Sequence, residues 1–193
     1  MRAWDAARDL LCVLGDRAMI ETRRLVLRRW RDSDREPFAA LNADPRAMEF
    51  FPSVLSRAES DRAVDRIEAH FESHGFGLFA AEFRESGAFI GFIGLWTPDF
   101  EAPFAPCVEI GWRLAAAYWN QGLATEGAKT VLGHGFDSLR LAEIVSFTTV
   151  ANRPSRRVME KIGMTRRPTD DFDHPKLPEG HPLRPHVLYR ISR

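Results

Sequence analysis

The chain has 193 residues, which suits one domain with a sizeable core, and it is 45% hydrophobic and 28% charged, as globular proteins usually are. Lysine plus arginine and aspartate plus glutamate each number 27, and this zero net charge argues against a nucleic-acid-binding protein. No apolar run approaches the roughly 20 residues that span a bilayer, so no membrane partner is expected. Cys12 and Cys107 are too few for a disulfide framework, which favours a reducing, cytoplasmic location.

Residues 1–18 differ in pattern from the rest of the chain. Their apolar positions could form a short amphipathic helix, but Asp and Arg residues interrupt the apolar stretch, so a signal peptide is not expected. Two interpretations stay open: a helix that packs on the domain, or an over-extended start with the natural one at Met19. Residues 1–19 are then an N-terminal extension, and residues 20–193 are the domain.

The first predicted elements are a strand and two helices. Residues 20–31 alternate between apolar and charged positions and predict the strand. Side-chain oxygens at 32–34 could cap a helix that runs to about Asn42. Apolar residues at helical spacing over 56–74 predict a second helix, which ends at Gly75.

Strands and a loop follow. Residues 76–84 and 89–97 are apolar and β-prone, and the turn at 85–88 joins them as a hairpin. The three prolines of 98–106 indicate a loop. Residues 107–114 predict the next strand.

The most informative stretch continues from that strand through a turn into a helix. Asn120, Gln121 and Gly122 break the strand pattern, and a helical apolar stripe begins at Ala124. The first N–H groups of a helix have no intrahelical partner, and Gly122 lets the backbone approach a ligand closely, so this is a suitable anion site. It lacks the motifs Gly-Lys-Ser/Thr and Gly-x-Gly-x-x-Gly, which suggests a pyrophosphate that is bound and not cleaved.

The remaining elements complete a mixed α/β single domain. In order, they are a strand at 141–150, a helix at 152–162 that stops at Gly163, a short strand at 164–169, a loop at 170–185 with four prolines, and a final strand at 186–192. The glycines of the segment 133–135 weaken their helix, which favours close packing of that helix on the sheet.

Residues 118–127, Tyr-Trp-Asn-Gln-Gly-Leu-Ala-Thr-Glu-Gly, resemble the pyrophosphate loop of the GNAT acyl-CoA N-acetyltransferases, with the pattern Gln/Arg-x-x-Gly-x-Gly/Ala. Gly122 and Ala124 fit its last two defined positions, whereas Trp119 stands where Gln or Arg is commonest. A Trp there is familiar from the branch that includes ribosomal-protein N-terminal acetyltransferases, and residues 21–28 resemble the opening strand of the same branch.

A second segment, 151–164, resembles the Asn-x-x-Ser/Ala…Gly-Phe motif of the same family at the right distance along the chain. The resemblance covers 20–193. It implies a GNAT-type mixed, mostly antiparallel central sheet flanked by helices, in which the strands 107–114 and 141–150 splay apart. It also implies acetyl-CoA as the cosubstrate, with the pantetheine arm along the first of these strands, and an acceptor site beside the two early helices.

The resemblance places the acetyl-CoA contacts on the strand, the loop and the second motif. The residues are Ile110, Gly111, Trp112, Arg113, Leu114, Trp119, Asn120, Gln121, Gly122, Leu123, Ala124, Thr125, Asn152 and Ser155. Gly111 fits a close backbone approach, although a β-bulge is an alternative. Asn152 could bind a pantetheine amide or cap its helix, and the arginines of 153–157 could face solvent or meet the 3′-phosphate.

Direct attack of an amine on the thioester needs a base, donors for the oxyanion and a group that meets the leaving thiolate. The frequent GNAT acid, a Tyr, is replaced here by Met159, so Ser155 is the candidate thiolate partner, unless it only bonds first-turn N–H groups. Glu109 is the candidate base, acting directly or through water, unless it is a structural partner of an arginine such as Arg113. Glu143 is a weaker candidate, and His186 a third.

The sequence therefore predicts an acetyl-CoA-dependent N-acetyltransferase, an acyltransferase whose acceptor is a primary amine of a protein N-terminus or a small molecule. The alternative is a non-catalytic acyl-CoA-binding or regulatory module. The histidines between 174 and 186 follow no zinc pattern, so no metal is expected. Trp30, Trp96 and Trp112 are expected in the core, and the protein could be a monomer or a homodimer.

Overall fold

One mixed sheet organises the part of the chain described by the structure, a computed structural model that covers residues 19–193. Its strand order is β1-β2-β3-β4-β5-β6-β9-β7, and β8 pairs with β9. The strands are Ile20–Glu21 (β1), Leu25–Arg28 (β2), Leu78–Phe83 (β3), Ala88–Trp96 (β4), Glu109–Leu114 (β5), Glu143–Thr149 (β6), Thr165–Arg166 (β7), Phe172–Asp173 (β8) and Pro185–Ser192 (β9). Within the described residues only β5 and β6 pair in parallel, which confirms the mostly antiparallel fold.

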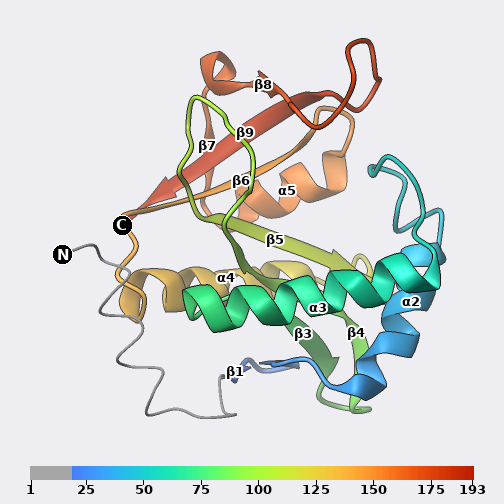
Figure 1. Ribbon diagram of the computed structural model, residues 1–193. Helices are drawn as coiled ribbons and strands as arrows, with labels where there is room; N and C mark the ends of the chain where they lie inside the picture. The colour runs from blue at the N-terminus through green and yellow to red at the C-terminus, as the bar shows by residue number, and fades with distance from the viewer. Residues whose placement is uncertain (1–18) are drawn as a thin grey trace.

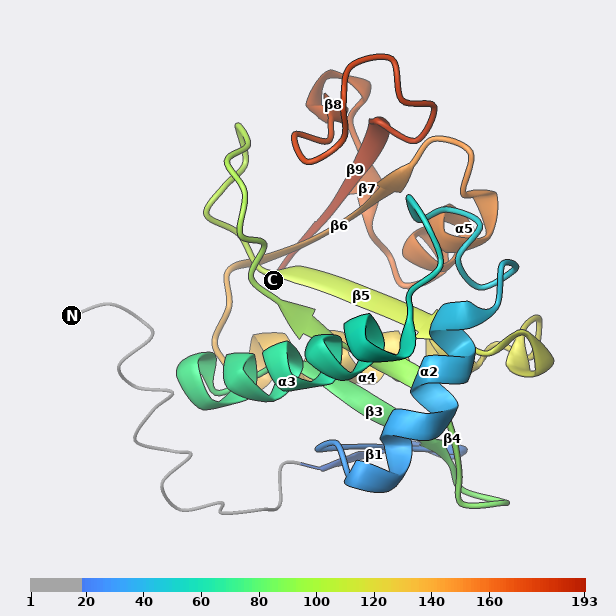
Figure 2. The ribbon, with the colours of Figure 1, turned by 45° about the vertical axis from the view of Figure 1, so that its right-hand side comes forward.

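Helices cover both faces of this sheet (Figure 1). They are Arg35–Ala43 (α2), Arg57–His74 (α3), Leu123–Asp137 (α4) and Arg153–Lys161 (α5), with short 3-10 helices at Asp32–Asp34 (η1), Ala116–Tyr118 (η2) and Pro168–Asp170 (η3). Helices α2 and α3 lie on one face of the β2–β5 half, α4 lies on the other, and α5 lies beside β6 (Figures 1 and 2). The interpretations offered for residues 1–18 fall outside the described residues.

The first strand differs from its prediction. The expected single strand over 20–31 is two short strands, β1 and β2, which pair with each other. Thr22 Oγ1 accepts a bond from Leu25 N at 2.8 Å, and the Glu126 carboxylate accepts one from Arg24 N at 2.8 Å. Because side chains satisfy these backbone donors, the chain turns between the strands instead of extending through them.

The two early helices confirm their predicted ranges, but one cap differs. Helix α3 has a capping box of Ser56 and Glu59 and ends at Gly75, whose φ of 78° is left-handed. At the start of α2, Asp34 occupies the cap position without bonding the helix N–H groups. Its carboxylate instead accepts two bonds from Arg28, at 2.7 and 2.9 Å, so this predicted capping residue serves a buried ion pair.

Small residues let α4 pack closely on the sheet. A Cβ on Gly135 would lie 2.6 Å from Ile144 Cδ1, and one on Gly127 would lie 2.4 Å from Ile93 Cδ1. The expected close packing of the segment 133–135 is therefore confirmed at Gly135. Gly133, in contrast, faces open space. The three tryptophans also pack as expected: Trp30 is 9% exposed, and Trp96 and Trp112 lie partly buried against the core.

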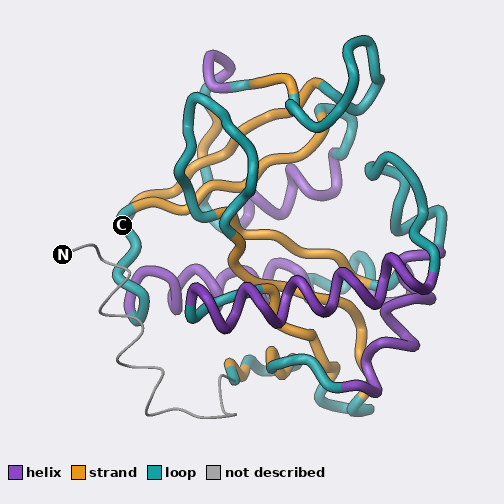
Figure 3. Tube along the Cα trace, in the orientation of Figure 1, coloured by secondary structure: helices purple, strands orange, loops and turns teal. Residues whose placement is uncertain are grey.

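The C-terminal part contains more structure than predicted. The expected strand over 164–169 shrinks to β7 because Pro168, which lacks an N–H, opens the η3 turn. The expected loop over 170–185 contains β8, whose Phe172 pairs with His186 of β9. A strand of two residues is too short to produce a sequence period, so sequence patterns could not show it. Figure 3 shows the long loops that remain before β5 and β9.

The site is positioned by the divergence of β5 and β6. They share a single register pair, Glu109 with Val145, and Val145 N donates to Val108 O at 2.9 Å. Beyond this point the strands separate, as Figures 1 and 2 both show, which confirms the predicted splay of the central strands. Among the helices of residues 19–193, none is long and apolar enough to cross a membrane.

Candidate active site

Strand β5 presents alternate residues to the two sides of the sheet. Arg113 contacts Phe38 of α2, so Glu109, Gly111 and Arg113 lie on the face that α2 and α3 cover. Ile110 lies on the opposite face, where α4 packs, and is fully buried. The face with Glu109 and Arg113 is therefore the one on which a ligand between β5 and β6 would meet the two early helices.

Glu109 lies at the vertex of the splay. Its carboxylate makes no ion pair or hydrogen bond within residues 19–193, so the alternative of a structural pair with Arg113 is wrong. Burial raises the pKa of Glu109 to about 8. A carboxylate with such a pKa is a stronger base than an ordinary one, and it titrates in the range where a general base is most effective.

Gly111 leaves room beside Glu109. A Cβ at this position would find no other heavy atom within 4 Å. The register of β4 and β5 runs without a shift through the pair of Gly94 and Gly111, so the alternative of a β-bulge is wrong. The space next to the strand is therefore consistent with close approach of a ligand to the backbone.

The loop between β5 and α4 has the geometry of an anion site. Asn120 and Gly122 have φ of 59° and 77°, and Gly122 is the N-cap of α4. Trp119 Nε1 donates to Leu114 O at 2.7 Å, and Gln121 Nε2 donates to Ala117 O at 3.0 Å. These two side chains hold the turn in place. The first N–H groups of α4 have no intrahelical partner, so they can bind an anion.

At the second motif, Asn152 caps α5. Its Oδ1 accepts from Ser155 N at 3.2 Å, and its Nδ2 donates to Thr148 Oγ1 at 2.9 Å, which confirms the cap interpretation. Ser155 Oγ makes no hydrogen bond with residues 19–193, so the alternative in which it bonds first-turn N–H groups is wrong. Met159 is 1% exposed and belongs to the core.

The two weaker base candidates lie elsewhere. Glu143 forms an ion pair with Arg190 at 2.7 Å. His186 bonds Arg184 O through Nδ1 at 2.9 Å, and burial lowers its pKa. It pairs with Thr149, four residues along β6 from the vertex, or about 13 Å of strand, so the structure does not bring it together with Glu109.

The family follows from the sequence profile described as the acetyltransferase (GNAT) domain, which matches residues 24–165. The chain belongs to the GNAT acetyltransferase family. It is 29% identical to the uncharacterized N-acetyltransferase YnaD of Bacillus subtilis over 89% of this chain and 95% of that protein. It also resembles the crystal structure of an acetyltransferase from Agrobacterium tumefaciens, with a TM-score of 0.73 and 26% identity over 92% and 95% of the two chains.

Another solved structure shares the fold at lower identity. The ribosomal-protein-S5-alanine acetyltransferase of Vibrio fischeri has a TM-score of 0.72 and 13% identity, covering 91% of this chain and 97% of that one. This similarity shows the fold alone. The family match and the related N-acetyltransferases show that the chain is an acetyltransferase enzyme.

GNAT enzymes generally use acetyl-CoA, and the residues of this GNAT chain fit that molecule. The left-handed Gly122 and the free N–H groups of α4 suit its pyrophosphate, and the open space at Gly111 suits its pantetheine arm. Within the described residues, no group of three or more His, Cys, Asp or Glu could hold a metal ion. That the enzyme needs no metal stays a prediction.

Sequence analysis missed the residues that hold the loop of this GNAT chain in place. Glu126, in the first turn of α4, accepts bonds from Thr22 Oγ1 at 2.7 Å and from Arg24 N and Nε, both at 2.8 Å. Burial tends to raise the pKa of Glu126, but the bonds from Thr22 and Arg24 outweigh this and lower it. The sequence signal that could have identified Glu126 is its position as an acidic residue in the first turn of a helix, where a negative charge is favourable.

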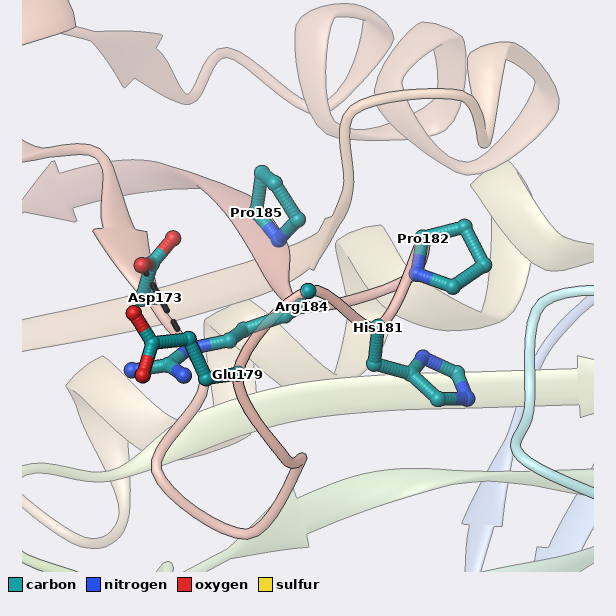
Figure 4. Close-up of a pocket in the computed structure, with 7 residues that line it drawn as sticks. Asp173, Glu179, His181, Pro182, Arg184 and Pro185 are labelled. Carbon is teal, nitrogen blue, oxygen red and sulfur yellow. Dashed lines mark ion pairs between the residues drawn. The ribbon is translucent and has the colours of Figure 1, made fainter.

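Two cavities of the described residues lie on loops. One of about 310 Å³ lies before β9, where Arg184 forms an ion pair with Asp173 at 3.4 Å (Figure 4). Its lining is Asp173, Glu179, Gly180, His181, Pro182, Arg184 and Pro185. A second is lined by residues of the loop between β4 and β5. Neither includes a residue expected to contact acetyl-CoA.

Proposed function

We propose that this enzyme transfers the acetyl group of acetyl-CoA to a primary amine by direct attack of the amine on the thioester. The observation that carries the proposal is the unpaired Glu109, with a pKa of about 8, at the vertex where β5 and β6 part. An ammonium must lose a proton before it can attack, and the ionised form of Glu109, whose fraction grows as pH rises towards 8, accepts that proton.

The proposed steps balance within this site. The amine nitrogen forms a bond to the thioester carbon, and its proton passes to Glu109 directly or through water. Peptide N–H groups of β5 beyond Glu109 have no strand partner on the β6 side and are available to the oxyanion. The carbon–sulfur bond then breaks, and the Ser155 hydroxyl donates a hydrogen bond that stabilises the charge of the leaving thiolate. The thiolate takes up the second proton of the nitrogen, directly or through water, and leaves as the CoA thiol.

Direct attack is favoured over a covalent acetyl-enzyme. Cys107 lies two residues before Glu109 and is the free cysteine of residues 19–193. Burial, together with the charge of Glu109, raises the pKa of its thiol to about 11. The thiol is therefore protonated at neutral pH and is a weak nucleophile.

The remaining assignments extend the same proposal. Acetyl-CoA contacts the loop of residues 119–125, the backbone of β5 from Ile110 onward, and the start of α5 at Asn152, which leaves the side chain of Arg113 free for another ligand. The sequence of that loop, with Trp119, supports membership of the branch that includes ribosomal-protein acetyltransferases, so a protein N-terminus is one acceptor class and a small amine the other. His186 is kept as the alternative base.

The test is release of free CoA thiol from acetyl-CoA with a panel of amines: N-terminal peptides, small polyamines and aminoglycosides. Mass spectrometry of the product identifies the acetylated nitrogen. We expect release with at least one amine class, and acetyl-CoA binding by calorimetry in the absence of an acceptor. Binding without release for every amine would contradict the proposed acceptor chemistry.

Residues 20–193 are proposed to form the acetyltransferase domain, with residues 1–19 as an N-terminal extension. A chain that begins at Met19 should then keep its acetyl-CoA affinity and a melting temperature within a few degrees of the full chain. A large loss of either would show that residues 1–18 belong to the domain.

A further inference from the structure

Arg113 occupies an unusual environment on the acceptor face of β5. Its guanidinium carbon lies 4.7 Å from the ring centre of Phe51, 5.2 Å from that of Phe92 and 5.7 Å from that of Phe38. One terminal nitrogen contacts Met48 Sδ at 2.6 Å. Aromatic faces attract a cation, but each such contact contributes about 0.5–2 kcal/mol, less than a buried charge requires.

The guanidinium has no counter-charge. No carboxylate of residues 19–193 forms an ion pair with Arg113, and its Nε is buried without a hydrogen-bond partner. Burial alone lowers its pKa to about 10, so it remains charged at neutral pH. Arg28, a buried arginine of the same sheet, differs from the partly buried Arg113 because it pairs with both Asp34 and Glu82, at 2.7 and 2.8 Å.

Glu109 and Arg113 form a complementary arrangement. They share one face of β5, four residues apart, which is about 13 Å of extended strand. Burial is the cause of the pKa shift of each group. Gly111 lies between them and leaves the intervening surface open. A ligand on this surface would meet an unpaired acid at one end and an unpaired guanidinium at the other.

We propose that Arg113 binds a carboxylate of the acceptor, so that the preferred acceptors carry an amine and a carboxylate together. This inference rests on the proposed N-acetyltransferase function. A planar guanidinium binds a carboxylate through two parallel hydrogen bonds, and desolvation by the surrounding rings strengthens them.

A single negative charge fits better than a phosphate. Arg113 supplies one cation, whereas a phosphate monoester carries about −1.5 to −2 charges at pH 7. Arg46, a basic residue of the segment between α2 and α3, is exposed and is paired with Asp44 at 2.9 Å. The carboxylate could belong to a free amino acid or to an acidic side chain of an N-terminal peptide, and the test separates these two sources.

The experiment compares matched acceptors with the full-length enzyme. Each amino acid is paired with its carboxamide, and each N-terminal peptide that contains Glu is paired with its Gln counterpart. For the source that is correct, we expect kcat/KM for the carboxylate to exceed that for the amide by about tenfold to a hundredfold, the range for hydrogen bonds to a charged group. Equal rates in every pair would overturn the proposal.

Variants then assign the preference to Arg113. In Arg113→Gln the preference should disappear through a rise in KM, while kcat for the amide acceptors stays within about threefold. Arg113→Lys, which keeps the charge but loses the planar fork, should retain part of the preference. Arg46→Gln, the same change at an exposed arginine, should retain all of it.

Calorimetry distinguishes acceptor binding by Arg113 from a role in acetyl-CoA binding or in folding. Wild-type enzyme with CoA should bind the carboxylate member of a pair even without turnover, and Arg113→Gln should not, so this readout stands if the proposed acetyl transfer fails. A fall of more than tenfold in acetyl-CoA affinity in Arg113→Gln would assign Arg113 to acetyl-CoA and overturn the proposal. An equal loss of kcat/KM for both members of a pair would show a structural role only.

Discussion

The two faces of β5 lead to regions that differ in how their charged residues are paired. On the side of α4, Arg24, Thr22 and Glu126 satisfy one another with bonds of 2.7 to 2.8 Å and fix the loop at Gly122. On the side of α2 and α3, Glu109 and Arg113 are partly buried without a partner of opposite charge. The first region is complete before a ligand binds, as suits a molecule that every turnover uses. The second is completed only by a ligand that supplies the missing charges.

The largest expected effect is at the loop. Gly122→Asp should abolish measurable acetyl-CoA binding by calorimetry, because its carboxylate would repel the phosphates from the N-terminus of α4. Gly180→Asp is a matched control, since Gly180 has a φ of 78° against 77° at Gly122, and both are substituted in the same way. Unchanged acetyl-CoA affinity in a folded Gly122→Asp protein would show that acetyl-CoA does not bind at this loop.

The next largest effect tests Glu109. Glu109→Gln should lower kcat at pH 7 by about a hundredfold or more, the range for loss of a general base. In the wild type, kcat/KM should rise as pH increases through about 8, where Glu109 loses its proton. The deficit of the variant should narrow at high pH, where the amine is already neutral.

Glu143→Gln is the control for this prediction, because Glu143 is paired with Arg190 on the neighbouring strand. Its rate should stay close to that of the wild type. If Glu109→Gln kept full kcat at neutral pH with a good acceptor, the base would have to be His186 or an ordered water chain.

A smaller effect is expected at Ser155. Ser155→Ala should lower kcat by about tenfold at every pH, since stabilisation of the thiolate does not depend on amine ionisation. The backbone N–H of Ser155, which Asn152 caps, is unchanged, so the melting temperature should be retained. If Ser155→Ala kept full kcat, the thiolate would leave without help from a side-chain hydroxyl, and positioning of the reactants alone would account for the rate.

A smaller effect still is expected at Glu126, which holds the loop in place through its bonds to Thr22 and Arg24. Glu126→Gln removes the ion pair with Arg24, whose side chains are 21% and 32% exposed. We expect a loss of about 1–2 kcal/mol in unfolding free energy, the lower part of the range for bonds to a charged group. Acetyl-CoA affinity should fall by a few fold while acceptor preference stays the same. A changed acceptor preference would show that the two regions are not separate.

The last effect concerns stability alone and sharpens the contrast at Glu109. Its folded-state pKa of about 8 lies above the ordinary 4.5, so the folded chain binds this proton more tightly than the unfolded chain does. The contribution of Glu109 to stability must therefore decrease as pH rises from about 4.5 to 8. In urea unfolding, the free energy of unfolding of Glu109→Gln should increase relative to that of the wild type as pH rises over this window. If the difference in unfolding free energy between the two proteins were the same at pH 4.5 and at pH 8, the raised pKa of Glu109 would be contradicted.

Local sequence signals made part of the fold and of the candidate site predictable. Gly122 at a turn, Asn152 before a helix and Gly75 after one are effects of neighbouring residues, and each appears where sequence patterns placed it. The splay of β5 and β6 followed from the family resemblance, not from periodicity, because one strand pair leaves no pattern in either strand.

The remaining features depend on contacts between distant residues. The break between β1 and β2 requires Glu126, 102 residues from Arg24. The enclosure of Arg113 requires Met48, 65 residues away. In the sequence, Arg113 is a charged residue on the same strand as Glu109, and this placement suggested an ion pair between the two. Which charges stay unpaired is decided by the burial of each side chain, and neither composition nor spacing contains that information.

The single bond from Val145 N to Val108 O makes amide hydrogen exchange a direct measure of occupancy. The amides of β5 that face β6 beyond this bond have no strand partner and should exchange rapidly in the free protein. A pantetheine arm along β5 would protect them, while the amide of Val145 should be slow with or without ligand. Mass-resolved exchange at these positions could then count bound sites for any acyl-CoA, including analogues that are never turned over.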